Sequence, residues 1–271
     1  MIKHILPQYT LKGIYDFFTN KNERTFLRLA LLYGGKKRFE EIRINFSEYK
    51  FIVPDARSFL WQFKEIFVEE YYRFETELTA PVIFDCGANV GTSCAFFKKI
   101  YPQSRILAFE PNPRIAEYLR SNIKNNLLEN IEVIEKAVWI HNDGIELGLE
   151  SADASSIHLE RNKIKVGSVR LKDLLDNKET VYMLKIDIEG AEIEVLKDCG
   201  QSLNNVKNIF VEFHSYTRKP QKLSEMISVL ESSGFRYFIM QPENRSRPFL
   251  NKANKFNPEM DLQLNIFAYR F

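Results

Sequence analysis

The stretch Pro81–Ser93, with the sequence PVIFDCGANVGTS, decides the fold. A short apolar run ends in an acid, passes through a turn with Gly87 and Gly91, and opens a helix immediately afterwards. This order is typical of the first strand and nucleotide-binding loop of a doubly wound α/β fold. Asn89 stands at the second glycine position of the dinucleotide fingerprint, and the third glycine is also replaced. The loop therefore predicts a nucleotide-type ligand but disfavours a dinucleotide.

The length and net charge of the chain limit the folds and the ligands to be expected. The chain has 271 residues, with 38 Lys and Arg against 36 Asp and Glu, so it can bury a full core and its net charge gives no reason to expect nucleic acid. Three cysteines without metal-ligand spacing predict reduced, mostly buried thiols. No signal peptide and no apolar stretch of about 18 residues is found, so we expect a cytoplasmic protein without a membrane span.

Residues 1–80 are predicted to form an N-terminal extension that mixes helices with a hairpin. Asn22 is expected to cap a helix that two glycines end. Alternating apolar residues predict a hairpin over residues 39–53, and Asp55 is expected to cap an aromatic-rich helix. The pair Tyr71–Tyr72 follows shortly before the glycine loop, where it could close over a ligand.

Strand and helix patterns alternate over residues 81–271, which we assign to a second domain. Such alternation predicts a mostly parallel sheet with helices on both faces. The third strand is expected over residues 131–138 and to run on through a turn into residues 145–149. The last strands, residues 235–240 and 264–271, are expected to form an antiparallel pair at the edge.

Two acids follow the first two strands. Glu110 ends the second strand, 19 residues after Gly91, where a carboxylate usually accepts hydrogen bonds from ribose hydroxyls. Asp85 ends the first strand beside the loop. It could accept hydrogen bonds from loop amides or meet a cationic group of a ligand, and the sequence does not separate these roles.

Ionisable residues gather at the ends of the next two core strands. Alternation places Lys185 and Asp187 on one face of the fourth strand, and Glu189 follows in the turn. Glu212 and His214 lie near the carboxyl end of the fifth strand. Because open α/β sheets bind ligands at this edge, we expect the four acid and imidazole side chains to converge. Lys185 is expected to be neutralised by Asp187 or Glu189, since an unpaired buried charge is costly.

Three motifs carry a family resemblance. The stretches DCGANVG at 85–91, AFEPNP at 108–113 and KIDIEGAE at 185–192 resemble the FkbM-type S-adenosylmethionine-dependent methyltransferases. The resemblance extends over about residues 67–214. It implies a class-I, Rossmann-like methyltransferase fold whose seven-stranded sheet has the order 3-2-1-4-5-7-6, with strand seven antiparallel.

The resemblance also implies roles for individual residues. S-adenosylmethionine is the implied cofactor, with its methionine part held by the loop residues Gly87, Asn89 and Gly91. Glu110 would hold the ribose, and Ala137–Val138 would lie against the adenine. The family favours hydroxyl acceptors, often sugars of glycans or secondary metabolites. Residues 172–175 depart from the family's Leu-Asp-Asp-like turn, so the contact expected there is in doubt.

Catalysis has several possible routes. His214 or Asp187 could remove the proton of an alcohol acceptor while the other orients it, and Glu189 is the third candidate catalytic residue. A divalent metal held by this cluster is an alternative, but carboxylate clusters are frequent at sheet ends, and we name no metal ligand. The polar segment Ser151–Asn162 is expected either to contact the acceptor or to be an ordinary solvated loop.

Rival functions remain open at this point. A nucleic-acid methyltransferase shares the fold, but the chain has no Asn-Pro-Pro-Tyr-like motif and no basic stripe. An NAD-dependent dehydrogenase is disfavoured by the loop. A non-catalytic S-adenosylmethionine-binding module is opposed by the intact loop and Glu110. The sequence predicts an enzyme acting on a small-molecule or glycan acceptor, and it leaves the acceptor's identity and the oligomeric state undecided.

Overall fold

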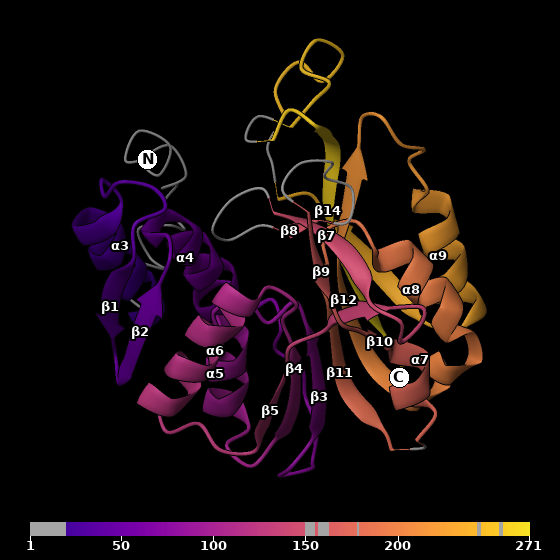
Figure 1. Cartoon of the computed structure of the whole chain (residues 1–271), viewed down its shortest axis with the longest axis horizontal. Coiled ribbons are helices and arrows are strands. Elements are labelled where there is room, and N and C mark those ends of the chain that lie inside the picture. The colour runs from indigo at the N-terminus through magenta and orange to yellow at the C-terminus, as the bar shows by residue number, and fades with distance from the viewer. Residues whose placement is uncertain (1–19, 150–154, 157–162, 178, 243–244, 255–256) are drawn as a thin grey trace.

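The computed structural model describes residues 20–149, 155–156, 163–177, 179–242, 245–254 and 257–271. Its centre is a seven-stranded sheet (Figure 1). The strands are β3 (Val82–Cys86), β4 (Arg105–Phe109), β5 (Ile131–Ile134), β11 (Val181–Ile186), β12 (Val206–Tyr216), β13 (Arg236–Met240) and β14 (Met260–Tyr269). They lie in the order β13-β14-β12-β11-β3-β4-β5, and only β14 is antiparallel to its neighbours in this sheet. The predicted fold class and strand order are confirmed.

Helices cover both faces of this sheet. The helices are α5 (Thr92–Ile100), α6 (Pro113–Asn125), α7 (Leu171–Leu175), α8 (Glu192–Cys199) and α9 (Leu223–Ser232), and a 3-10 turn (Gly200–Asn205) follows α8. Figure 1 shows α5 and α6 on one face and α7, α8 and α9 on the other. Each layer buries its own apolar cluster against the sheet. The right-handed crossovers of such a sheet leave the carboxyl ends of its central strands open for a ligand.

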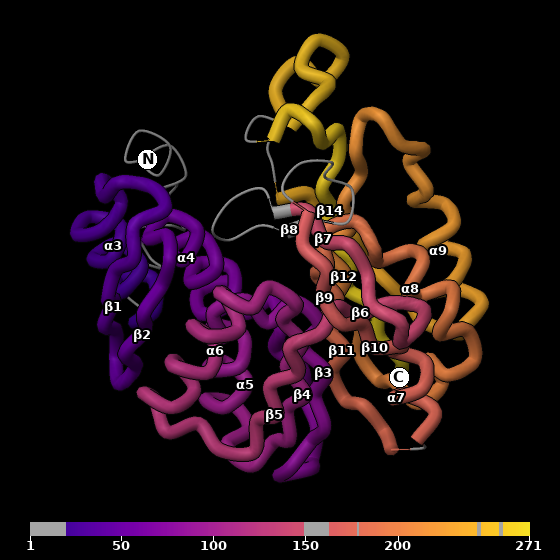
Figure 2. The backbone as a smooth tube through the Cα atoms, in the orientation of Figure 1, coloured from indigo at the N-terminus to yellow at the C-terminus, as the bar shows by residue number. Residues whose placement is uncertain are grey.

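The N-terminal segment packs on the α5 and α6 side of the sheet (Figure 2). It contains α3 (Lys21–Tyr33), β1 (Ile42–Phe46), β2 (Tyr49–Val53), α4 (Ala56–Phe63) and a π-helical turn (Lys64–Val68). The Phe46 ring lies 4.9 Å from that of Phe63 and 5.3 Å from that of Phe67, and Phe67 lies 5.6 Å from Phe96 of α5. Burying one such ring is worth about 1.5–3 kcal/mol. The division into domains 1–80 and 81–271 stays a prediction, because one apolar core spans both parts.

Polar contacts fix the same junction. The Asn122 side chain of α6 accepts from the Ile52 amide at 2.7 Å and donates to the Ile52 carbonyl at 2.9 Å. The pair extends the edge of β2 with a side-chain amide, so β2 is bonded to a helix on this side rather than to another strand. Asn122 also donates to the Val90 carbonyl of the glycine loop at 2.9 Å. The N-terminal hairpin is thereby tied to the loop.

Two local predictions are wrong. Asn20, not Asn22, caps α3: its side chain accepts from the Asn22 amide at 2.8 Å, while the Asn22 side chain donates to the Phe67 carbonyl. The third strand is also not continuous. The Lys136 amide bonds back to the Ile134 carbonyl, and the chain then leaves the large sheet.

The residues after this break form two small sheets. β6 (Ala137–Trp139) pairs in parallel with β10 (Ser168–Arg170), and β7 (Ile145–Leu149) pairs with β8 (Ser155–Ser156) and β9 (Lys163–Val166). After the break, β6 and β7 therefore belong to two small sheets and do not continue β5 of the large sheet. All three cysteines are buried and free. Within the described ranges, no helix is long and apolar enough to span a bilayer.

Candidate active site

The glycine loop is locked against the end of β11. Gly87 has φ +87°, and a Cβ on it would lie 1.9 Å from the Asp187 carbonyl oxygen. The amides of Gly87 and Ala88 both donate to the Phe109 carbonyl, at 3.0 and 2.9 Å. Only glycine permits this positive φ together with so close a backbone approach. The loop thus joins the ends of β3, β4 and β11 into one rigid edge.

Gly91 has a different task. It takes φ +90° at the start of α5, and a Cβ there would lie 2.8 Å from Leu119 Cδ1 of α6. Gly91 therefore sets the packing of α5 against α6 and does not belong to the wall of either cavity described below. The prediction that Gly91 holds the methionine part of a ligand stays a prediction.

One cavity opens beside the end of β4, with about 680 Å³ of empty space including the part open to solvent. We call it the β4 cavity. Its apolar walls come from β4, α6, β6, β7 and the turn after β11. It is lined by Gly87, Asn89, Phe109, Glu110, Pro111, Ile115, Ala137, Val138, Ile145, Leu147, Asp187, Ile188, Glu189 and Ala191. Seven predicted site residues share this one cavity: Gly87, Asn89, Glu110, Ala137, Val138, Asp187 and Glu189.

Glu110 is the buried acid of the β4 cavity, with 7% of its surface exposed. One carboxylate oxygen accepts from the Asn89 amide at 3.1 Å and the other from the Asn112 amide at 2.9 Å. Burial raises the pKa of Glu110 to about 7, although both amide hydrogen bonds and Lys185 lower it. Each oxygen keeps a further lone pair for a ligand hydroxyl, as a ribose site requires.

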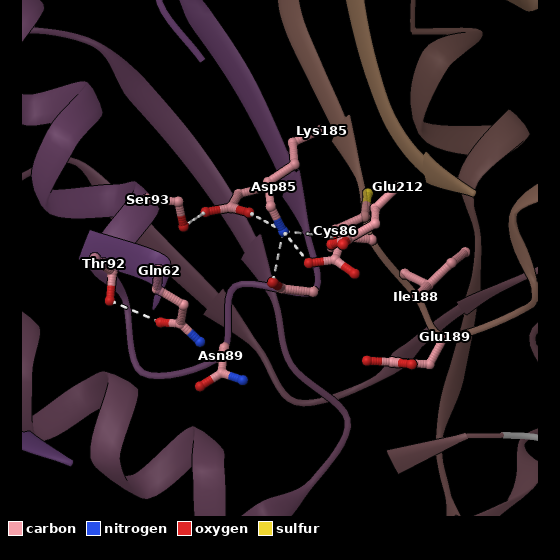
Figure 3. A network of polar contacts seen from close by, with 12 residues as sticks. Gln62, Asp85, Cys86, Asn89, Thr92, Ser93, Lys185, Ile188, Glu189 and Glu212 are labelled. Carbon is pink, nitrogen blue, oxygen red and sulfur yellow. Dashed lines mark hydrogen bonds and ion pairs between the residues drawn. The ribbon is translucent and has the colours of Figure 1, made fainter. Parts of the chain in front are cut away.

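Lys185 stands at the centre of a buried ion network (Figure 3). Its ammonium lies 3.4 Å from Asp85 Oδ1 and 3.4 Å from Asp187 Oδ2, and donates to the Gly87 carbonyl at 2.8 Å. Burial lowers the pKa of Lys185, but Asp187 and Asp85 raise it above the usual value, so the ammonium stays charged.

The partners of Lys185 differ in part from the prediction. Asp187 does pair with it, whereas Glu189 lies beside His214 instead. Asp85 is fully buried and also accepts from the Ser93 hydroxyl. Asp85 is not among the residues that line either cavity, and its predicted contact with a ligand or with loop amides stays a prediction. Its ion pair joins it to a residue 100 positions later in the chain, which no local pattern reveals.

A second cavity lies on the other side of the loop, with about 840 Å³ of empty space including the part open to solvent. We call it the β12 cavity. The strand ends supply Lys185, Asp187, Glu189, Glu212, His214 and Gln263, and the loop supplies Gly87, Ala88, Asn89, Thr92 and Ser93. The N-terminal segment supplies Ser58, Trp61, Gln62, Glu65, Ile66 and Tyr72.

The N-terminal segment is attached directly to the loop at this cavity. The Thr92 hydroxyl donates to Gln62 Oε1 at 3.0 Å, as Figure 3 shows. Tyr72 lies here, with its ring 5.8 Å from the Lys185 ammonium, so it can face a ligand as predicted. Tyr71 instead packs edge-on against Phe267, with 5.6 Å between the ring centroids, and lies away from this cavity.

His214 is held between two carboxylates. Its Nδ1 lies 2.9 Å from Glu192 Oε1 and its Nε2 lies 3.7 Å from Glu189 Oε2. Burial lowers the pKa of His214, but Glu189 and Glu192 raise it well above the usual value. Glu192 itself is 1% exposed, and the same oxygen accepts from the Gly190 amide at 2.9 Å. The imidazole is therefore fixed in orientation between two carboxylates.

Carboxylates crowd the rest of the β12 cavity. Burial and the nearby Asp187 raise the pKa of Glu65 to about 7, and the same two causes raise the pKa of Glu212 well above its usual value. Oxygen atoms of Asp187 and Glu212 and a nitrogen of His214 all lie within 4.8 Å of one another. Groups with such raised pKa values in a cavity are candidates for proton transfer.

Sequence reasoning missed several of these residues. The buried aromatic face of residues 56–68 accounted for the whole apolar pattern of this segment. No local signal therefore marked Trp61, Gln62 or Glu65 as site residues. Glu192 did carry a local signal. An acid in the first turn of a helix that follows a cluster of strand-end charges can turn back onto that cluster. The segment Ser151–Asn162, apart from residues 155–156, lies outside the described residues.

Comparisons with known proteins agree with this geometry. The methyltransferase FkbM domain matches residues 85–237, which is more than half of the chain. Methyltransferase sdnD of Sordaria araneosa is 29% identical over 212 residues, covering 64% of this chain and 80% of the relative. The 2-O-methyltransferase NoeI of Sinorhizobium fredii is 26% identical over 155 residues, covering 49% and 63%. The hexuronic acid methyltransferase AglP of Haloferax volcanii is 25% identical over 154 residues, covering 54% and 61%.

Proposed function

The chain belongs to the family of the methyltransferase FkbM domain, and we propose that it transfers the methyl group of S-adenosylmethionine to a hydroxyl of a sugar, a glycan or a secondary metabolite. That the protein is a methyltransferase follows from its family. The identity of the acceptor atom and of the residues that act on it is the proposal.

The residues of the β4 cavity fit S-adenosylmethionine. Glu110 would accept from the ribose hydroxyls, and the apolar walls at Ala137 and Val138 would hold the adenine. Gly87 and Asn89 would face the methionine part, where the absence of a Cβ at Gly87 keeps the loop against β11. When bound, S-adenosylmethionine supplies an electrophilic methyl group on a sulfonium.

The observation that carries the proposal is the wall shared by the two cavities. Gly87, Asn89, Asp187 and Glu189 line both the β4 cavity and the β12 cavity. Methyl transfer is an in-line displacement, so donor and acceptor must approach from opposite sides of the reacting carbon. Two cavities that meet at one wall provide this arrangement.

The chemistry of the β12 cavity favours a polar, hydroxyl-bearing acceptor. Its walls offer carboxylates, two glutamine amides and the ring of Trp61, which is 41% exposed. Amides and acids recognise hydroxyl groups, and an aromatic ring packs on the apolar face of a sugar. The names of NoeI and AglP, which specify 2-O-methylation and a hexuronic acid, support the same class of acceptor.

Asp187 is our choice for the group that removes the acceptor's proton. It lines both cavities, and its 3.4 Å contact with Lys185 leaves the second carboxylate oxygen available. His214, held by Glu192, would orient the acceptor oxygen or Asp187. Glu189 would assist from the other side of the ring, where its Oε2 lies 3.7 Å from His214 Nε2. Positioned acid–base groups of this kind contribute about 10²–10⁴ in rate.

The test is transfer of a labelled methyl group from S-adenosylmethionine to a panel of neutral glycosides, uronic acids, phenols and RNA. We expect a sugar or other hydroxyl acceptor to be labelled. At saturating S-adenosylmethionine, Asp187→Asn and His214→Ala should lower turnover by about 10²-fold. Salt-sensitive methylation of RNA would indicate a nucleic-acid methyltransferase instead. Near wild-type turnover in both variants would contradict the catalytic roles of Asp187 and His214.

A further inference from the structure

We propose that Asp187, Glu212 and His214 form a binding site for one divalent transition-metal ion, such as Mn²⁺, at the floor of the β12 cavity. The three side chains come from the ends of β11 and β12, two neighbouring parallel strands. One ligand atom of each lies within 4.8 Å of the others.

The orientation of His214 is the first independent support. The imidazole is 7% exposed, and its Nδ1 is occupied by Glu192 at 2.9 Å. This leaves Nε2 as the atom on the side of the cavity, where Glu189 Oε2 lies 3.7 Å away, beyond hydrogen-bond distance. A histidine that ligates a metal through one nitrogen usually donates its other N–H to a carboxylate. Glu192 supplies that carboxylate.

The charge of the cavity is the second support. Among the described residues, four carboxylates line it, from Glu65, Asp187, Glu189 and Glu212, against the cations Lys185 and His214. Lys185 is already shared with Asp85, which is fully buried outside the cavity. This excess of carboxylates in one cavity favours a divalent cation as its ligand. The positive charge of the ion would offset their mutual repulsion.

The ligand set also indicates the kind of ion. Two carboxylates and one imidazole suit Mn²⁺, Fe²⁺ or Zn²⁺, whereas Ca²⁺ and Mg²⁺ prefer oxygen ligands alone. Three protein ligands leave coordination positions open toward the cavity. If the proposed function holds, an acceptor hydroxyl would take one of these positions, where the ion lowers the pKa of that hydroxyl.

The experiment is titration of the whole protein with Mn²⁺ alone, without S-adenosylmethionine or acceptor, followed by the loss of the free-ion electron paramagnetic resonance signal. We expect one ion per chain, with an affinity that falls at least tenfold in Asp187→Asn and in Glu212→Gln. Both substitutions preserve shape, and circular dichroism verifies that the variants are folded. Glu132→Gln is the matched control, because Glu132 is exposed on β5, and it should bind Mn²⁺ as the wild type does.

The outcomes separate this site from the proposed function. Absence of saturable binding up to millimolar Mn²⁺, or equal affinity in all variants, would overturn the metal site even if methyl transfer proceeds. Binding that the two ligand variants abolish would establish the site even if no hydroxyl acceptor is ever labelled. Unchanged methyl transfer after exhaustive chelation, together with Mn²⁺ binding, would show a site that serves structure and not the reaction, and would overturn its proposed contact with the acceptor.

Discussion

The two cavities on either side of the glycine loop are built in different ways. The β4 cavity is formed by residues between 87 and 191, all of them within the matched family domain. The β12 cavity adds Trp61, Gln62 and Glu65 from before the domain and Gln263 from after it. The β4 cavity therefore lies wholly within the matched domain, whereas the β12 cavity also takes residues from outside it.

On the proposed function, this difference separates the residues that would bind the donor from those that would select the acceptor. The donor side needs fixed backbone geometry, which Gly87 and the strand ends provide. The acceptor side depends on side chains carried by an aromatic-packed segment, which can change without altering the sheet. Substitutions in the two cavities should then affect different measured constants, and the following predictions test that separation from the largest effect to the smallest.

The largest effect is expected for Gly87→Ala. The new Cβ would lie 1.9 Å from the Asp187 carbonyl, so the loop must leave the end of β11 and both cavities lose their shared wall. A positive φ for alanine adds roughly 1–2 kcal/mol. We expect the affinity for S-adenosylmethionine, measured by calorimetry, to fall more than about 100-fold, with a lower melting temperature. Gly35→Ala, whose Cβ meets nothing within 4 Å, should leave both values unchanged.

Glu110→Gln should weaken S-adenosylmethionine without affecting the acceptor. The amide keeps the shape but loses the charge and one acceptor group toward the Asn89 or Asn112 amide. A hydrogen bond to a charged group is worth about 1.5–3 kcal/mol, so we expect the Kd to rise roughly 10- to 100-fold. The KM for the acceptor, measured at saturating donor, should stay within about twofold. A rise in both constants would contradict the separation of the two cavities.

The sequence predicted features that depend on neighbouring residues better than contacts between distant ones. The alternation of strands and helices predicted the large sheet, and the three motifs predicted Glu110 and the loop, because each signal lies within a few residues. The predicted third strand failed at Lys136, where a backbone turn rather than a glycine or proline diverts the chain. The contacts of Asp85 with Lys185 and of Glu65 with Asp187 could not be predicted, because each joins residues about 100 or more positions apart.

A third, smaller effect is expected in the pH dependence of S-adenosylmethionine binding. Burial raises the pKa of Glu110 to about 7, so the carboxylate that accepts from ribose is present above about pH 7 and is lost as the pH falls. Affinity for S-adenosylmethionine should then decrease about tenfold between pH 7 and pH 6 at most, since one pH unit corresponds to 1.36 kcal/mol. Glu110→Gln should flatten this dependence.

The free energy of unfolding of the ligand-free protein should respond to Glu110 in the opposite sense. Because the folded state holds the proton more tightly than the unfolded chain, which releases it near pH 4.5, this residue favours folding less as the pH rises from about 4.5 to about 7. Chemical denaturation of the wild type and Glu110→Gln at pH 6 and pH 8 isolates the contribution. A wild-type binding profile that is flat across pH 7 would contradict the raised pKa of Glu110.

The smallest effect is expected for Trp61→Ala on the acceptor side. Trp61 lines only the β12 cavity and is 41% exposed, so its removal leaves the buried aromatic core of the N-terminal segment intact. Loss of an aromatic contact with a bound sugar costs about 0.5–1.5 kcal/mol, which corresponds to a roughly 2- to 12-fold higher acceptor KM. The Kd for S-adenosylmethionine should not change. Leu78→Ala, at a residue that is 47% exposed and outside both cavities, is the control. If Trp61→Ala weakened the donor and spared the acceptor, the assignment of the β12 cavity to the acceptor would have to be reversed.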